Sequence, residues 1–219
     1  MFVMSLFLAD EQVSLAYTEL RSRVIDLLRG TSASDAELVV AHCPNWRVRD
    51  LAAHLIGVPD DIVNGRMEGV ASDAWTAAQV ARHSAKPLTQ IADELAKMAT
   101  QFDAMLPHFP ATARSQMVMD AVTHEHDLRH ALGKPGARDS LAVRAGLAWF
   151  AERIHTDFPN DYEMIFGVGL SNFDLIRCLT GRRSLAQAQA LGLSSDAIAS
   201  LKKIQAGSPL RAPAQDLTE

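Results

Sequence analysis

The feature that most constrains the fold is a long amphipathic stripe in the middle of the chain. Between Pro87 and Pro107, apolar residues recur at every third or fourth position: Leu88, Ile91, Leu95, Met98, Phe102, Met105 and Leu106. This spacing places the side chains on one face of an α-helix, which must then be buried against other elements. A helix over residues 88–106 is therefore predicted.

Three further segments show the same period. They cover residues 10–29, about 46–57 and 112–132, and Gly30, Pro44 and Gly133 lie at their boundaries. Asn45 is the expected N-cap of the second segment, and residues 57–73, which contain Pro59 and three glycines, are expected to form a loop or a broken helix. Four amphipathic helices of this length favour a mainly all-α protein built on a four-helix bundle.

The pattern changes after residue 138. A helix is expected over 140–155, a short strand within 161–170, and three more helices at 172–180, 184–191 and 195–206, of which the first has a capping box from Ser171 and Asp174. The predicted organisation is a bundle over residues 1–138, a small helical or α+β appendage over 139–207, and a disordered tail over 208–219.

Composition excludes several classes of protein. The net charge of −5 carries no basic excess, so binding to nucleic acid is not expected. The N-terminal apolar run lacks a basic region and a cleavage site, and no segment resembles a membrane span. The two cysteines, Cys43 and Cys178, are read as reduced thiols. A cytoplasmic protein is expected, and one exposed apolar face of the bundle would allow a homodimer.

A cluster of metal-ligand residue types lies on the last helix of the predicted bundle. Asp120 and His124 are one turn apart on the same side of that helix, and His54 lies on the apolar face of another. Two imidazoles, one carboxylate and an open position are typical of a catalytic zinc site, and iron or nickel would also accept this set. Asp127 could orient an imidazole of the site from behind.

Each of these residues also has a simpler interpretation. A histidine on an apolar helix face is commonly a hydrogen-bonded core residue. His126 and His130 are interpreted as a solvated pair on the outer face, and Glu125 with Arg129 as a surface ion pair. Cys43 is interpreted as a packed thiol, because the sequence places no basic residue beside it.

Four stretches resemble the mycothiol-dependent maleylpyruvate isomerase family of the DinB-like superfamily, known from actinobacteria. They are CPNWRVRDLAAHL (43–55), DAWT (73–76), residues 120–133, and FDLIRCLTGRRS (173–184), so the resemblance spans about residues 40–190. It implies a four-helix bundle with a divalent metal ion, usually zinc, held by His54, Asp120 and His124. The family typically has Glu at the position of Asp120, and Asp is one methylene shorter.

The resemblance also implies a reaction. The metal ion would lower the pKa of the thiol of mycothiol, whose thiolate adds to an electrophilic substrate for isomerisation or thiol transfer. Arg82 and Arg177 are candidates for binding an anionic cosubstrate, and Trp46 for lining its pocket. Arg182 and Arg183 are alternatively a pair that meets carbonyls at a helix end, and Trp46 and Trp75 are alternatively packing residues.

Three functions remain open from the sequence. The first is a metal-dependent, mycothiol-using isomerase or S-transferase. The second is a catalytically silent bundle that binds a metal or another ligand. The third is a structural helical protein whose inward histidines are hydrogen-bonded in the core.

Overall fold

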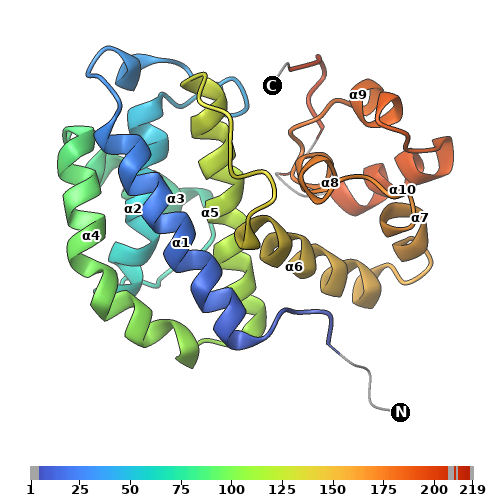
Figure 1. Ribbon diagram of the computed structural model, residues 1–219, viewed down its shortest axis with the longest axis horizontal. Helices are drawn as coiled ribbons and strands as arrows, with labels where there is room; N and C mark the ends of the chain where they lie inside the picture. Colours follow the sequence, from blue (N-terminus) through green and yellow to red (C-terminus); the bar gives the residue numbers. More distant parts are fainter. Residues whose placement is uncertain (1–4, 207–209, 211, 218–219) are drawn as a thin grey trace. The chain divides into compact units, whose positions relative to one another are not determined.

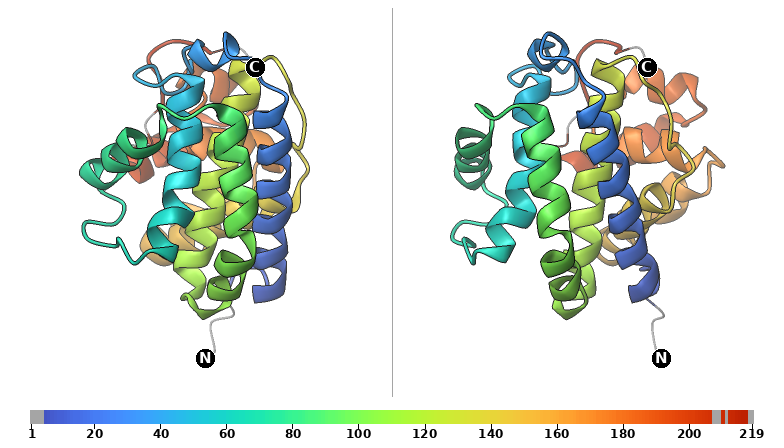
Figure 2. Two further views of the ribbon diagram at one scale, coloured as in Figure 1. Left: turned by 90° about the vertical axis from the view of Figure 1, so that its left-hand side faces the viewer. Right: turned by 60° about the vertical axis from the view of Figure 1, so that its left-hand side comes forward.

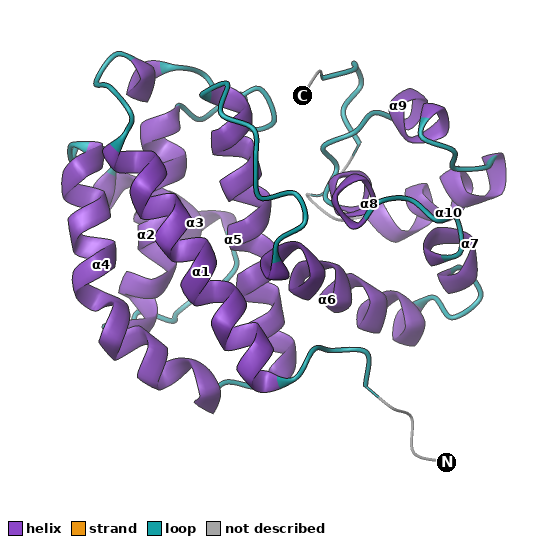
Figure 3. Ribbon diagram, viewed as in Figure 1, coloured by secondary structure: helices purple, strands orange, loops and turns teal. Residues whose placement is uncertain are grey.

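The structure is a computed structural model that describes residues 5–206, 210 and 212–217. This part of the chain forms ten α-helices, with no β-sheet and a single isolated bridge between Val39 and Arg47 (Figure 3). The expectation of an all-α protein is confirmed. Within the described residues, no helix combines the length and the apolar character that a membrane crossing requires.

The contacts between residues divide the chain into two compact units, and the boundaries fall inside helices. One unit comprises Ser14–Pro110 and His124–Gly136, and the other comprises Met1–Val13, Ala111–Thr123 and Ala137–Glu219. Helices α1 (Asp10–Arg29) and α5 (Ala111–Ala131) therefore each contribute residues to both units. The predicted boundary at residue 138 lies close to the last of these divisions and stays a prediction.

The first unit contains the predicted bundle. Helices α1, α2 (Val48–Val63), α4 (Leu88–Met105) and the end of α5 run alongside one another, and α3 (Asp73–His83) packs on α2 (Figures 1 and 2). Arg21 of α1 forms a bidentate pair with Asp103 of α4, at 2.6 and 2.7 Å. Short 3₁₀ helices lie at Asp35–Glu37 and Leu106–His108.

Helix α2 differs from the prediction at both ends. It begins at Val48, after Arg47 rather than Asn45, and the carboxylate of Asp50 accepts the backbone N–H of Arg47 at 2.9 Å. It then continues through Pro59 to Val63. Proline removes one hydrogen bond from a helix interior, but α2 is buried on both sides of Pro59 by its packing on α3 and α4. Tertiary packing therefore outweighs the local helix-breaking signal.

The second unit is built from the first half of α5 and the helices that follow it. These are α6 (Leu141–Asp157), α7 (Tyr162–Phe166), α8 (Asn172–Leu179), α9 (Leu185–Ala190) and α10 (Ser195–Gln205). A Cβ atom at Gly146 would lie 3.1 Å from the backbone of Met119 and 3.2 Å from Val122, so this glycine permits α6 to lie close against α5. The capping interaction predicted for Ser171 is present, at 3.0 Å from the N–H of Asp174.

The strand predicted within 161–170 is wrong, because residues 162–166 form the short helix α7. Tyr162 and Phe166 stack at a centroid distance of 4.8 Å, one helical turn apart, and Ile165 is buried. A short apolar and aromatic run fits a strand or a buried helical turn equally well, and the packing of this run selects the helix.

Part of the tail predicted to be disordered is described. Asp216 bonds to the hydroxyl of Ser184, and the carbonyl of Leu217 accepts a hydrogen bond from Gln187 at 2.6 Å. Residues 208, 209, 211, 218 and 219 of that predicted tail lie outside the described residues. The described end of the chain is thus tied to the start of α9.

Candidate metal centre

His54 and His124 face one another across the bundle, from α2 and α5. Their rings meet edge to face at a centroid distance of 5.1 Å, and both side chains are buried. Asp120 lies one turn before His124 on α5. Each of these three residues offers a ligand atom, and the three atoms all lie within 4.8 Å of one another. The structure thus brings the three predicted ligands together.

The orientation of His54 is set by two residues that sequence reasoning missed. Its Nδ1 lies 2.9 Å from Oε1 of Gln79 on α3, and Nε2 of Gln79 donates to Oδ2 of Asp61 at 3.0 Å. Because the amide group of Gln79 donates to Asp61, its oxygen is left to accept from His54. His54 therefore carries its proton on Nδ1 and keeps a lone pair on Nε2, the form that a metal ligand requires.

Asp61 is held in place by cations. Its side chain is 1% exposed, Arg66 donates to it at 2.7 Å, and Arg82 pairs with the same oxygen. The carboxylate is therefore compensated although it is buried. Arg82, predicted to bind the cosubstrate, takes part in this network, and its role in binding a cosubstrate stays a prediction.

A glycine makes the contact between α2 and α3 possible. A Cβ atom added at Gly57 would lie 2.6 Å from Cγ of Gln79, well inside van der Waals contact. Gly57 is one turn after His54, and Asp61 follows one turn later on the same face of α2. The spacing of His54, Gly57 and Asp61 places them on one face of α2. Their shared role could not be predicted, because it depends on helix α3, which the sequence pattern did not predict.

His124 is oriented in an equivalent way. Its Nδ1 lies 3.1 Å from Oδ2 of Asp127, which is fully buried one turn later on α5. A carboxylate facing Nδ1 holds the proton on that nitrogen and leaves Nε2 with a lone pair. Both histidines of the set are thus in the same tautomeric form, and each is fixed by a buried hydrogen-bond acceptor.

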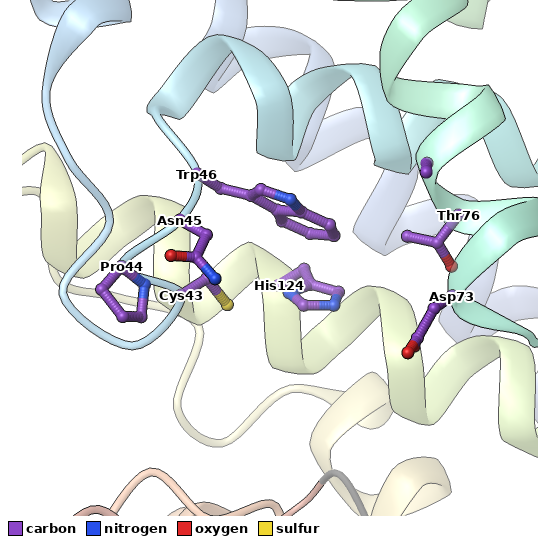
Figure 4. Close-up of a pocket in the computed structure, with 8 residues that line it drawn as sticks. Cys43, Pro44, Asn45, Trp46, Asp73, Thr76 and His124 are labelled. Carbon is purple, nitrogen blue, oxygen red and sulfur yellow. The ribbon is translucent and has the colours of Figure 1, made fainter.

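A pocket of about 440 Å³ opens beside His124. The loop before α2, the first turn of α3 and His124 line it (Figure 4): Cys43, Pro44, Asn45, Trp46, Asp73, Thr76, Ala77 and His124. The Trp46 ring lies over the two histidines, at centroid distances of 5.4 Å from His54 and 5.9 Å from His124. Trp46 is therefore a pocket residue. The indole N–H of Trp75 instead donates a hydrogen bond to the carbonyl of Arg66 at 2.9 Å.

The other predicted cosubstrate ligand, Arg177, is buried, and its role in binding a cosubstrate stays a prediction. Arg177 belongs to the second unit, where it is 1% exposed and donates to the carbonyl of Thr123 at 3.4 Å. Arg182 donates to the carbonyl of Thr180 at 2.6 Å, which fits the helix-end interpretation. Cys43 is half-buried and lines the pocket, and its interpretation as a packed thiol stays a prediction.

The polar face predicted for α5 is also corrected. His126 is 5% exposed rather than solvated, and the ring of His130 lies edge to face with that of His42 at 4.7 Å. Glu125 pairs with Arg129 as predicted, but it is fully buried and also accepts a bidentate bond from Arg23 of α1. The helix is buried on nearly every side in this region.

Comparison with known proteins identifies the family of the chain. Neither the curated proteins nor the solved structures that were compared include a match to the chain. The sequence model of one family, described as the mycothiol maleylpyruvate isomerase N-terminal domain, matches residues 17–133. That range is more than half of the chain and contains His54, Asp120, His124 and the pocket. The chain therefore belongs to the mycothiol maleylpyruvate isomerase N-terminal domain family.

Proposed function

We propose that this protein binds a divalent metal ion through His54, Asp120 and His124 and uses it to activate mycothiol for attack on an electrophilic small molecule. The observation that carries the proposal is the shared state of the two histidines, each with Nδ1 held by a buried acceptor. Two imidazoles whose Nε2 atoms are acceptors, beside a carboxylate, form a donor set for a metal ion.

The donor set fits zinc best among common ions. Two imidazoles and one carboxylate leave one coordination position of a tetrahedron open, and the pocket beside His124 supplies the space for a ligand there. When bound, the ion would lower the pKa of a coordinated thiol so that thiolate is present at neutral pH. Asp120 is partly exposed, whereas His54 and His124 are buried.

The remaining residues have supporting roles in this proposal. Gln79 and Asp127 hold the imidazoles in position, and Asp61 holds Gln79. Trp46 covers the histidines and limits the access of water to them. The pocket then admits the thiol and the electrophile together, and whether the reaction is isomerisation or S-transfer depends on the electrophile that the pocket accepts.

Elemental analysis of the purified protein tests the metal site. We expect about one metal ion per chain, lost in His54→Ala and in His124→Ala and retained in His108→Ala, which removes an exposed histidine at the end of the second 3₁₀ helix. Turnover of maleylpyruvate and other electrophiles would then be measured with and without mycothiol. A protein that holds no metal ion after reconstitution with zinc would contradict the proposal, and metal without thiol-dependent turnover would indicate a silent binding protein.

A further inference from the structure

A second group of ligand-type side chains lies beside the first. Cys43, His124 and Asp127 also offer three ligand atoms that all lie within 4.8 Å of one another. Cys43 comes from the loop before α2, and the other two residues from α5. The Sγ atom of Cys43 donates to Oδ2 of Asp127 at 3.8 Å, and the same oxygen lies 3.1 Å from Nδ1 of His124.

The two distances to Oδ2 of Asp127 are close to the separations between the ligands of a tetrahedrally coordinated metal ion. Bonds of about 2.3 Å to sulfur and about 2.0 Å to nitrogen or oxygen imply ligand separations of roughly 3.5 Å for sulfur with oxygen and roughly 3.3 Å for nitrogen with oxygen. The distances of 3.8 Å from Sγ of Cys43 and 3.1 Å from Nδ1 of His124 to Oδ2 of Asp127 differ from these values by only a few tenths of an ångström. The fourth position would face the pocket, because Cys43 and His124 both line it (Figure 4).

We propose that Cys43, His124 and Asp127 form a second metal site, selective for thiophilic divalent ions such as Cd²⁺, Co²⁺ or Zn²⁺. It shares His124 with the first site through the opposite ring nitrogen, Nδ1, which faces Asp127 and Cys43. The thiolate distinguishes the two sites, since soft ligands favour soft ions over those that prefer oxygen and nitrogen. An ion here replaces two protons, one on Nδ1 of His124 and one on the thiol of Cys43. Both protons are released to solvent, and Asp127 then binds the ion instead of orienting His124.

Cobalt spectroscopy provides a direct test. Co²⁺ is added to the metal-free full-length protein in buffer without any added thiol, because a thiol bound at the first site would itself give a sulfur signal. Coordination by Cys43 is expected to produce a sulfur-to-cobalt charge-transfer band in the near ultraviolet. The band is expected to be lost in Cys43→Ser, in Cys43→Ala and in His124→Ala.

The chain offers matched controls. Cys178 is its only other cysteine, and burial raises the pKa of its thiol to about 12, so Cys178→Ser is expected to keep the band. His54→Ala is also expected to keep it, because His54 serves only the first site. A band that survives both Cys43 variants, or no band at saturating Co²⁺, would overturn the second site.

The two metal sites give different cobalt signals. Visible cobalt absorption that requires His54, without any sulfur band, would refute the second site and support the first. A sulfur band that requires Cys43, without any cobalt binding that requires His54, would support the second site and contradict the first. His124→Ala is expected to lose both signals, because both sites use that ring.

Discussion

The hydrogen bonds of Gln79 lead to the most informative prediction, for the variant Gln79→Leu. Leucine has nearly the same volume and helix propensity as glutamine, so the substitution removes the two side-chain hydrogen bonds without opening a large cavity. Asp61 keeps its pairs with Arg66 and Arg82, but the Nδ1–H group of His54 is left buried without its acceptor. A buried donor without its partner costs about 1–3 kcal/mol of unfolding free energy.

The same variant should affect metal affinity more distinctively than stability. Loss of a group that orients a metal-binding histidine typically weakens binding by about 10- to 100-fold. Urea unfolding of the metal-free protein would measure the first effect, and a zinc titration against a chelator the second. Gln90→Leu is the control, since Gln90 is exposed on α4, where it donates to Glu94 at 2.9 Å. Its change in stability should stay within about 0.5 kcal/mol.

Two results would refute the reasoning. If Gln79→Leu bound zinc as tightly as the parent, Gln79 would not set the state of His54, and the unfolding cost would reflect an ordinary core hydrogen bond. If Gln90→Leu weakened zinc binding as strongly, the effect would not come from the contact with His54 at all.

Three other predictions follow from the same region. Gly57→Ala should lower the unfolding free energy by about 1–3 kcal/mol, measured by urea unfolding, because overpacking against Gln79 exceeds the roughly 1 kcal/mol that alanine gains in a helix. Asp120→Asn should reduce the bound zinc measured by elemental analysis while leaving the helical circular dichroism unchanged, because it removes the anionic ligand from a partly exposed position. Burial holds the pKa of His83 below its usual value of 6.5, against the opposing hydrogen bond to Asp60. As the pH drops, the unfolded chain therefore takes up a proton at this histidine before the folded chain does, so the free energy of unfolding should decrease below pH 6.5. Urea unfolding at pH 7.5 and 5.5 would measure this decrease. It should be smaller in His83→Gln than in the parent or in His108→Gln.

The sequence predicted the bundle well because its helices are marked by the spacing of apolar residues and by glycine and proline at their ends. The stripe over 88–106 and the breaks at Gly30 and Gly133 correspond to helices α1, α4 and α5 within one or two residues. The pattern failed at α3, where the buried positions are Gln79 and His83 rather than apolar residues. A helix that buries polar side chains has no apolar stripe to reveal it.

The candidate site was predictable only in part, for a related reason. Its three ligands could be proposed because Asp120 and His124 share a turn and His54 interrupts an apolar face. Gln79 and Asp61 could not, since their roles depend on how closely α3 approaches α2 at Gly57. That approach is a tertiary distance, which no single-sequence spacing encodes.

Helix α5 shows why the sequence pattern misjudges burial near the candidate site. A prediction from hydrophobic periodicity assumes that polar residues are exposed to solvent. Between Thr123 and Asp127, five consecutive polar residues are all buried, so a polar face in sequence becomes an interior face in the fold. Burying them is tolerable only where each finds a partner, as Glu125 does with Arg23 and Arg129, and His124 with Asp127. An apolar core of the same size would be at least as stable, so stability alone does not explain this concentration of buried polar groups, which is consistent with the metal site proposed at His124.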